Sequence, residues 1–196
     1  MSAVSDDAAW VIVETSLSPE ALRAFCEDLE RLYRINPCLE VHSWQRFAPD
    51  RFSAAVTNLS NGQHGVQDMA LERLSHGFRA VYSAGIKRST TFEIRPAPTG
   101  SSLTITDDYS DDETPLAGRE QEVDRSLWAW GVALRAYFEA ERRWGWVPGW
   151  SAYRRRVWLP MKPSARRITG LIVLVTIAEF AFFLLIVSIY WLEQQH

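Results

Sequence analysis

Histidines and strand-borne carboxylates are the side chains of this chain that could carry acid–base or metal chemistry. Three histidines are candidates by type: His42, His64 and His76. They form no HxH or HxxxH pair, so their spacing predicts no metal site. Three carboxylates on predicted strands could point into a cleft and exchange protons there: Glu14, Asp68 and Glu93. The solvent face of a sheet is the more common place for such residues, and we assign no catalytic residue.

The sequence also lacks the short motifs that identify common enzymes. There is no GxSxG, no GxxxxGK and no GxGxxG, which argues against a serine nucleophile, a P-loop and a dinucleotide site. Lys87 and Arg88 beside Thr90 and Thr91 could contact a ligand headgroup at a pocket mouth, although a solvated strand end explains them as well. We therefore expect a protein that is not an enzyme, with no cofactor or metal.

Charge divides the chain into an acidic part and a basic part. Residues 1–150 hold 15 Lys/Arg against 22 Asp/Glu, a net −7, whereas residues 151–196 hold 6 against 2, a net +4. This asymmetry argues against nucleic acid as a partner and favours contact of the basic part with anionic phospholipids. The two cysteines, Cys26 and Cys38, have no CxxC spacing and are expected to be reduced thiols.

The elements that must position these residues follow from turn signals and hydrophobic period. A strand is predicted over 9–16, then one helix or two short helices over 18–37, beginning at Ser18-Pro19 and ending at Pro37. Six strands follow in a meander, at 38–48, 51–59, 65–74, 77–85, 87–96 and 102–110, with a helix as the alternative across 64–74. A long helix is predicted over 116–143, stopped by Gly145 and Pro148, with one apolar stripe: Val123, Leu127, Trp130, Leu134, Tyr137 and Phe138.

Seven strands that curl around one amphipathic helix make an α+β fold with a deep cleft. This order, with "INPCLEVHSW", "YSAGIKRSTTFEI", "SSLTITDDY" and "EVDRSLWAW", resembles the START-like (SRPBCC) superfamily of polyketide cyclases and lipid-transport proteins across residues 8–146. The resemblance implies the helix-grip fold and an apolar pocket for a lipid, sterol, isoprenoid or polyketide-like ligand. Pocket candidates are Tyr82, Phe92, Trp130, Leu134 and Tyr137. The acid-rich "DDYSDDETPL" (107–116) is expected to be a solvated loop at the pocket entrance.

The C-terminal segment 168–192 has the length and composition of a transmembrane helix. Its 25 residues would extend about 37 Å, and sixteen of them are Leu, Ile, Val or Phe. These contribute about −5 to −10 kcal/mol to insertion, against about 3 kcal/mol for the central Glu179. The preceding basic residues place the domain in the cytoplasm and the short tail 193–196 on the opposite side. We saw no signal peptide, so we expect a tail-anchored, single-pass protein of a bacterial inner membrane, as in the bacterial members it resembles.

Two further features suggest how this span is used. Residues 147–167 are predicted to be a Trp/Arg-rich connector at the headgroup level, and the alternative is a tryptophan seam packed on the domain. The predicted interface residues, with those just before the connector, are Trp144, Trp146, Trp150, Arg154, Arg155, Arg156, Trp158, Lys162, Arg166 and Arg167. Glu179 should face an integral membrane partner or a second copy of the chain, or else stay protonated in lipid.

The sequence leaves three functions open. The first is a membrane-tethered protein that binds or transfers a lipid, isoprenoid or other hydrophobic small molecule at the cytoplasmic face. The second is a non-catalytic accessory subunit that docks on a larger membrane complex through the transmembrane helix. The third, which we favour least, is a cyclase or hydratase acting in the cleft.

Overall fold

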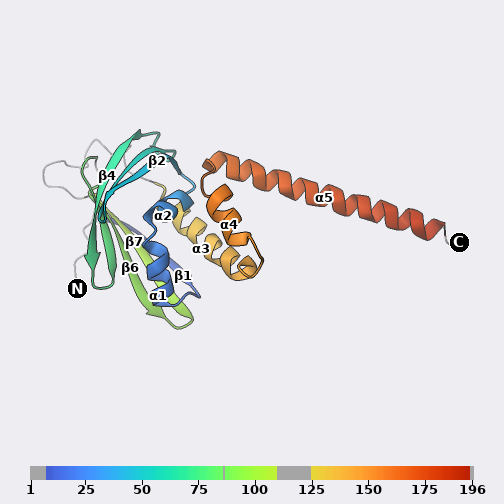
Figure 1. Ribbon diagram of the computed structural model, residues 1–196, viewed down its shortest axis with the longest axis horizontal. Coiled ribbons are helices and arrows are strands. Elements are labelled where there is room, and N and C mark those ends of the chain that lie inside the picture. The colour runs from blue at the N-terminus through green and yellow to red at the C-terminus, as the bar shows by residue number, and fades with distance from the viewer. Residues whose placement is uncertain (1–7, 86, 110–124, 195–196) are drawn as a thin grey trace. The chain divides into compact units, whose positions relative to one another are not determined.

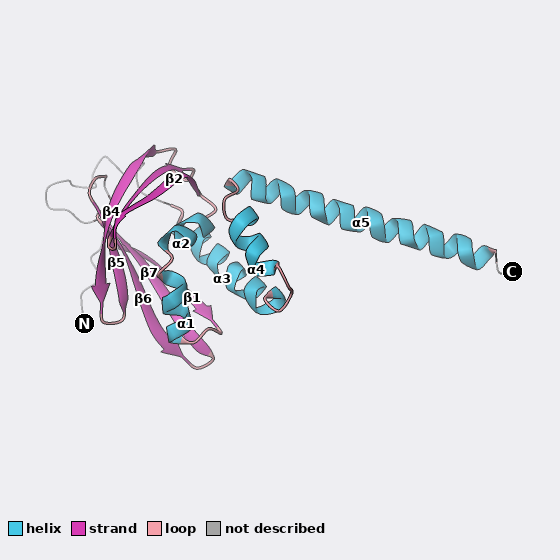
Figure 2. Cartoon of the chain, in the orientation of Figure 1, coloured by secondary structure: helices cyan, strands magenta, loops and turns pink. Residues whose placement is uncertain are grey.

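A computed structural model describes residues 8–85, 87–109 and 125–194 of the chain. By internal contacts the chain divides into two compact units, Met1–Pro160 and Met161–His196. The first unit is the predicted α+β domain, and the second is a single long helix. Figures 1 and 2 show the elements of each unit.

The domain is built on one seven-stranded antiparallel sheet in the order β1-β7-β6-β5-β4-β3-β2. The strands are β1 (Ala8–Thr15), β2 (Leu39–Ala48), β3 (Arg51–Asn58), β4 (His64–Leu74), β5 (Gly77–Tyr82), β6 (Ser89–Ala97) and β7 (Gly100–Asp108). All seven predicted strands are confirmed, including β4, for which a helix was the alternative. β2 carries two register shifts against β3, and such bulges increase the bend of a sheet.

Two short helices separate β1 from β2, which settles the choice between one helix and two. α1 (Pro19–Cys26) begins at Ser18, whose hydroxyl accepts a hydrogen bond from the Ala21 N–H. α2 (Leu29–Ile35) begins at Asp28, whose carboxylate accepts from the Arg31 N–H and so starts a new helix one turn after the first ends. Both helices lie on the same side of the sheet as the long helix α3 (Figure 2).

The long helix α3 (Leu127–Trp144) ends at Gly145 as predicted but begins later than predicted. Residues 110–124, with Val123, lie outside the described residues, and Arg125 and Ser126 are not helical. Tertiary hydrogen bonds hold these two residues, because the Arg125 N–H donates to Ser60 Oγ and Ser126 Oγ accepts from the Asn36 side chain at 2.8 Å. The prediction of one helix running from 116 to 143 is therefore wrong at Arg125 and Ser126.

α3 lies very close to the edge strand β1. A Cβ atom on Gly131 would come within 2.5 Å of Val11 Cγ2, so only glycine allows this approach of helix and strand. One helical face is buried here: Leu127, Trp130, Leu134, Tyr137 and Phe138. The predicted stripe is thus confirmed for every member that the structure describes.

The domain ends in a short helical segment, and the second unit is one uninterrupted helix. α4 (Trp150–Tyr153) continues into a π-helical turn at Arg154–Trp158. In the second unit, α5 (Pro163–Glu193) begins five residues before the predicted span. Its segment Pro163–Trp191 is long and apolar enough to cross a membrane, and no residue in its most apolar stretch of 18 residues is buried in the structure.

Candidate functional site

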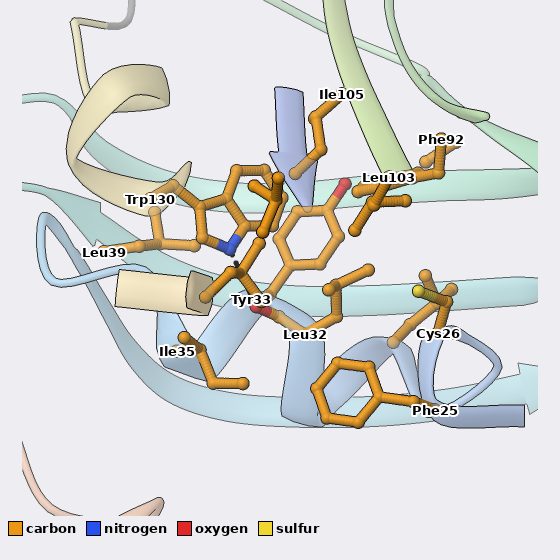
Figure 3. Close-up of a cluster of buried hydrophobic side chains, with 14 of the residues drawn as sticks. Phe25, Cys26, Leu32, Tyr33, Ile35, Leu39, Phe92, Leu103, Ile105 and Trp130 are labelled. Carbon is orange, nitrogen blue, oxygen red and sulfur yellow. Dashed lines mark hydrogen bonds between the residues drawn. The ribbon is translucent and has the colours of Figure 1, made fainter. Parts of the chain in front are cut away.

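The interior of the domain is filled by packed aromatic rings. Trp130 on α3 lies with its ring centroid 5.3 Å from that of Tyr33 and 5.7 Å from that of Phe92, and its indole N–H donates to the Leu32 carbonyl at 3.0 Å (Figure 3). Phe78 stacks on Phe92 from the neighbouring strand. These contacts join α2, α3 and the concave face of the sheet into one core.

The predicted pocket residues fall into two groups in this arrangement. Phe92, Trp130, Leu134 and Tyr137 are buried in the core, and the first two contact one another directly. Tyr82 differs, because it is half-buried and lines an open cleft, while the buried Tyr137 borders a second cleft on the helical side of the domain. Whether any of the five binds a ligand stays a prediction.

A chain of hydrogen bonds runs from this aromatic core to the end of the sheet. The Tyr33 and Tyr82 hydroxyls lie 2.5 Å apart, and Tyr82 bonds to Thr90 Oγ1 at 3.0 Å. Thr90 donates to Asp107 Oδ1 at 2.6 Å, and Lys87 Nζ donates to Asp107 Oδ2 at 2.9 Å. We call Tyr33, Tyr82, Thr90, Asp107 and Lys87 the polar chain. It links α2, β5, β6 and β7 within the domain.

The sequence placed Asp107 both in the last predicted strand, 102–110, and in the acid-rich loop 107–116, and the structure puts it on the strand. It is the last inward-facing position of β7 and only 1% exposed, and Lys87 and Thr90 satisfy its carboxylate. An alternating row of buried residues on β7 already contained the signal: Leu103, Ile105, Asp107 and Tyr109. The rest of the acid-rich loop, from 110 onward, lies outside the described residues. Lys87 and Thr90 both bond to Asp107, whereas Thr91 bonds to Arg79, and contact of these residues with a ligand headgroup stays a prediction.

Burial keeps the Tyr33 phenol of the polar chain neutral. It raises the pKa of Tyr33 well above its usual value, and the neighbouring Tyr82 hydroxyl raises it further. The Lys87 ammonium lies 6.0 Å from the ring centroids of both Tyr82 and Tyr109. Because the hydroxyl protons are donated along the chain toward Asp107, the chain offers hydroxyl acceptors backed by one ion pair. Such groups orient a bound oxygen or nitrogen atom well, and they make poor general bases.

Tyr82 also borders a cleft of about 560 Å³, which we call the β3–β5 cleft. Its lining is mostly apolar and comes from strands β3, β4 and β5 together with the end of β2. Phe52, Met69 and Tyr82 are register partners on three adjacent strands and form one wall, and Phe47 is 69% exposed beside them. The size lies within the usual range of small-molecule sites, about 300–1,000 Å³.

The other candidates for acid–base and metal chemistry are dispersed. Asp68 lines the β3–β5 cleft, Glu14 is exposed on β1, and Glu93 forms an exposed pair with Arg95 at 2.8 Å. His42 bonds to Thr57 on the neighbouring strand. Within the described ranges, no three His, Cys, Asp or Glu side chains are grouped as metal ligands. Cys26 and Cys38 are free thiols.

The predicted interface residues divide between exposed and buried positions. Trp144 and Trp146 are 47% and 77% exposed, whereas Arg154 is only 6% exposed. The Arg154 guanidinium carbon lies 3.9 Å from the ring centroid of Tyr137 and 4.7 Å from that of Trp158. Arg154 therefore does not face headgroups, because it stacks on aromatic rings of its own domain, and Trp158 packs there too. For the exposed residues, headgroup contact stays a prediction.

Comparison with solved structures decides the fold. An aromatase/cyclase from Streptomyces sp. R1128, Zhui, is similar to this chain with a TM-score of 0.53 and 16% identity, over 71% of this chain and 97% of that one. The domain has the helix-grip fold. A protein from Arthrobacter aurescens (TM-score 0.51, 12% identity, 71% and 90% covered) and one from Mycobacterium smegmatis (0.50, 11%, 68% and 92%) are similar to the helix-grip domain as well.

At these identities the likeness shows the fold alone, which is the fold that the resemblance to the START-like superfamily implied. No protein-family model matches the chain, and no curated protein matches it. The helix-grip fold carries both binding proteins and enzymes, so the function must be argued from the cleft and the polar chain.

Proposed function

We propose that this chain is a membrane-tethered protein that binds a hydrophobic small molecule and carries it to or from the bilayer surface. The observation that supports this most strongly is the β3–β5 cleft, where an apolar wall of adequate size includes the half-buried Tyr82. An apolar ligand with one hydroxyl group, which can donate to the Tyr82 oxygen, fits such a site, because a few placed polar groups fix orientation while apolar contacts supply affinity.

The polar chain supports binding more than catalysis. Asp107 is already satisfied by Thr90 and Lys87, so it is not poised to take a proton from a ligand. Tyr82 is the member that lines the cleft. Because Thr90 gives its proton to Asp107, Tyr82 donates to Thr90, and the Tyr82 oxygen can only accept a hydrogen bond from a ligand. The helix-grip neighbour from Streptomyces is an aromatase/cyclase by name, and a cyclase-type reaction here remains the function we favour least.

The tether is supported by the apolar segment of α5. This segment, Pro163–Trp191, has the length and composition of a membrane span. A basic flank of Lys162, Arg166 and Arg167 precedes its apolar run, and this flank favours a cytoplasmic domain under the positive-inside rule. Tethering raises the effective concentration of the domain at the surface, so a modest affinity for the ligand suffices.

Native mass spectrometry of the full chain purified in mild detergent tests the proposal. Phe47 is 69% exposed and lines the β3–β5 cleft, so Phe47→Ser removes apolar lining without disturbing the core. Trp128→Ser removes an aromatic side chain of similar exposure from α3 and serves as the matched control. We expect a bound small molecule in the wild type and the control, and at least a tenfold lower occupancy in Phe47→Ser. A wild type without bound small molecules, or equal occupancy in all three, contradicts the proposal.

A second function is favoured by one observation, the carboxylate of Glu179 in the middle of the apolar helix. An ionisable group at that depth usually faces protein, which fits an accessory subunit that docks on an integral membrane partner. Co-purification from native membranes separates the two functions. A partner that is lost in Glu179→Leu supports docking, and a preparation with the same composition in both forms opposes it.

A further inference from the structure

A second cleft lies on the helical side of the domain, separate from the β3–β5 cleft. It measures about 550 Å³ and is bordered by α1, α2, α3, α4 and the π-helical turn, so we call it the helical cleft. One side is apolar, formed by Leu17, Phe25 and Phe138 among others. The other side is cationic, formed by Arg31, Arg142 and Arg155. Its lining belongs entirely to the helix-grip domain.

Arg31 is held in this cleft in a fixed position. Its side chain is 11% exposed, its guanidinium carbon lies 4.0 Å from the Phe25 ring centroid, and Nη2 donates to the Phe25 carbonyl at 3.2 Å. The Nε atom is buried and has no hydrogen-bond partner in the described part of the chain, since Asp28 Oδ2 is 3.8 Å away. The buried Nε atom cannot touch a ligand, so Arg31 attracts an anion in the cleft through the charge of its guanidinium group.

Arg154 repeats this pattern beside the cleft. Its Nε and Nη2 atoms are buried without a hydrogen-bond partner among the described residues, and Glu141 Oε1 lies 3.8 Å from Nε. Glu141 lines the cleft, but its charge is thus shared with Arg154. Arg142 and Arg155 form no ion pair with any described residue. The cleft therefore concentrates positive charge in a domain whose residues 1–150 carry a net −7.

We propose that the helical cleft binds the phosphate group of an anionic phospholipid, with Arg31, Arg142 and Arg155 on the phosphate and the first part of an acyl chain along Leu17 and Phe138. Guanidinium groups match phosphate oxygens with paired N–H donors, and an apolar wall beside them favours an amphiphile over a simple ion. The site goes beyond the proposed function, because it requires no ligand in the β3–β5 cleft. It assigns Arg31, which the sequence did not single out, a direct role in lipid recognition.

Isothermal titration calorimetry on the full chain in dodecylmaltoside tests this site with three probes: dihexanoyl phosphatidic acid, dihexanoyl phosphatidylcholine and inorganic phosphate. We expect the phosphatidic acid to bind at one site, more tightly than the other two. Arg31→Gln and Arg142→Gln should each weaken it about tenfold or more, the usual cost of losing a charged hydrogen bond. Arg95→Gln removes the same charge from an exposed sheet position and should leave the affinity within about twofold.

Each other outcome overturns the proposal in a distinct way. Equal affinity for inorganic phosphate would make this a site for the free ion rather than for a lipid. Equal affinity for phosphatidylcholine would show that the acyl chains partition without headgroup recognition. Arg142 is exposed, so Arg142→Gln does not disturb the core. Unchanged binding in this variant would show that phosphatidic acid binds elsewhere, even if Arg31→Gln fails to fold.

Discussion

Replacing Lys87 by methionine removes the ammonium group that faces Asp107 at the end of the polar chain. Asp107 is 1% exposed, and after the change it keeps its hydrogen bond from Thr90 but loses its counter-charge 2.9 Å away. A carboxylate left in this state is far from water and has no compensating cation from Lys87. The domain should therefore become markedly less stable.

The magnitude follows from the geometry of this pair. Breaking a buried ion pair by removing one partner costs about 3–5 kcal/mol. The Lys87 side chain is 19% exposed, so water already screens part of the attraction, and we take about 3 kcal/mol. For a domain of this size each kcal/mol lowers Tm by about 2–4 °C, so Lys87→Met should lower Tm by about 6–12 °C.

A double-mutant cycle measures how strongly the charges of Lys87 and Asp107 are coupled. Lys87→Met combined with Asp107→Leu replaces the ion pair by two apolar side chains, an exchange that is often close to neutral in buried positions. The double variant should therefore be more stable than Lys87→Met alone, with a coupling energy of about 2 kcal/mol. Thermal melts of the full chain in detergent, followed by near-ultraviolet circular dichroism, measure both quantities.

An exposed pair provides the control for this cycle. Arg95 and Glu93 lie 2.8 Å apart, but their side chains are 67% and 39% exposed, so Arg95→Met should change the free energy of unfolding by less than about 1 kcal/mol. Strictly additive losses for Lys87 and Asp107 would refute the reasoning, because the two charges would then not be coupled. So would a loss from Lys87→Met no larger than that from Arg95→Met.

Three further predictions concern packing and ionisation. Gly131→Ala should cost about 1–3 kcal/mol in the same melts, because the added methyl group meets Val11 across a gap of 2.5 Å, and an unchanged Tm would contradict that contact. Burial raises the pKa of the Cys26 thiol from 9.0 to about 12, so at pH 8 iodoacetamide should modify the partly exposed Cys38 first, as peptide mass spectrometry would show. The raised pKa values of Cys26 and Tyr33 also mean that the unfolded chain releases protons first. Stability should be fully present below about pH 9 and fall as pH rises toward 12, by up to about 1.4 kcal/mol per pH unit for each group, and flat urea midpoints over that range would contradict this.

The strands and helix ends followed from local chemistry, and this is why the sequence predicted them. A β-branched apolar run placed β1 and period-two alternation placed the six later strands, and Ser18-Pro19 and Gly145 marked helix ends that the structure confirms. The beginning of α3 depends on contacts that no local rule contains, because Asn36 and Ser60 hold Ser126 and Arg125 from distant parts of the chain. Helical periodicity alone could not show that these tertiary hydrogen bonds compete with helix formation at Arg125 and Ser126.

Asp107 illustrates a different failure of sequence reasoning. The run of acidic residues after Thr106 is typical of a solvated loop, so Asp107 was expected to be exposed although the predicted strand 102–110 puts it in line with Leu103 and Ile105. Asp107 can be buried because Lys87 pairs with it. Lys87 lies twenty positions earlier in the chain, and only the pairing of β6 with β7 brings its ammonium group to the Asp107 carboxylate. A charged residue in an inward-facing position predicts a buried ion pair, but the sequence alone does not identify the residue of opposite charge.

Arg154 shows the same ambiguity in the connector. Tryptophan and arginine are suited to a bilayer interface, and they are equally suited to a stack of cation and rings inside a protein. Two contacts on α3 show that Arg154 packs inside the protein: its guanidinium carbon lies 3.9 Å from the Tyr137 ring centroid, and its Nε lies 3.8 Å from the Glu141 carboxylate. Arg155, the next residue in the chain, lines the helical cleft together with Arg31. The basic run thus holds one arginine that packs inside the domain and one that the proposed phosphate site would use.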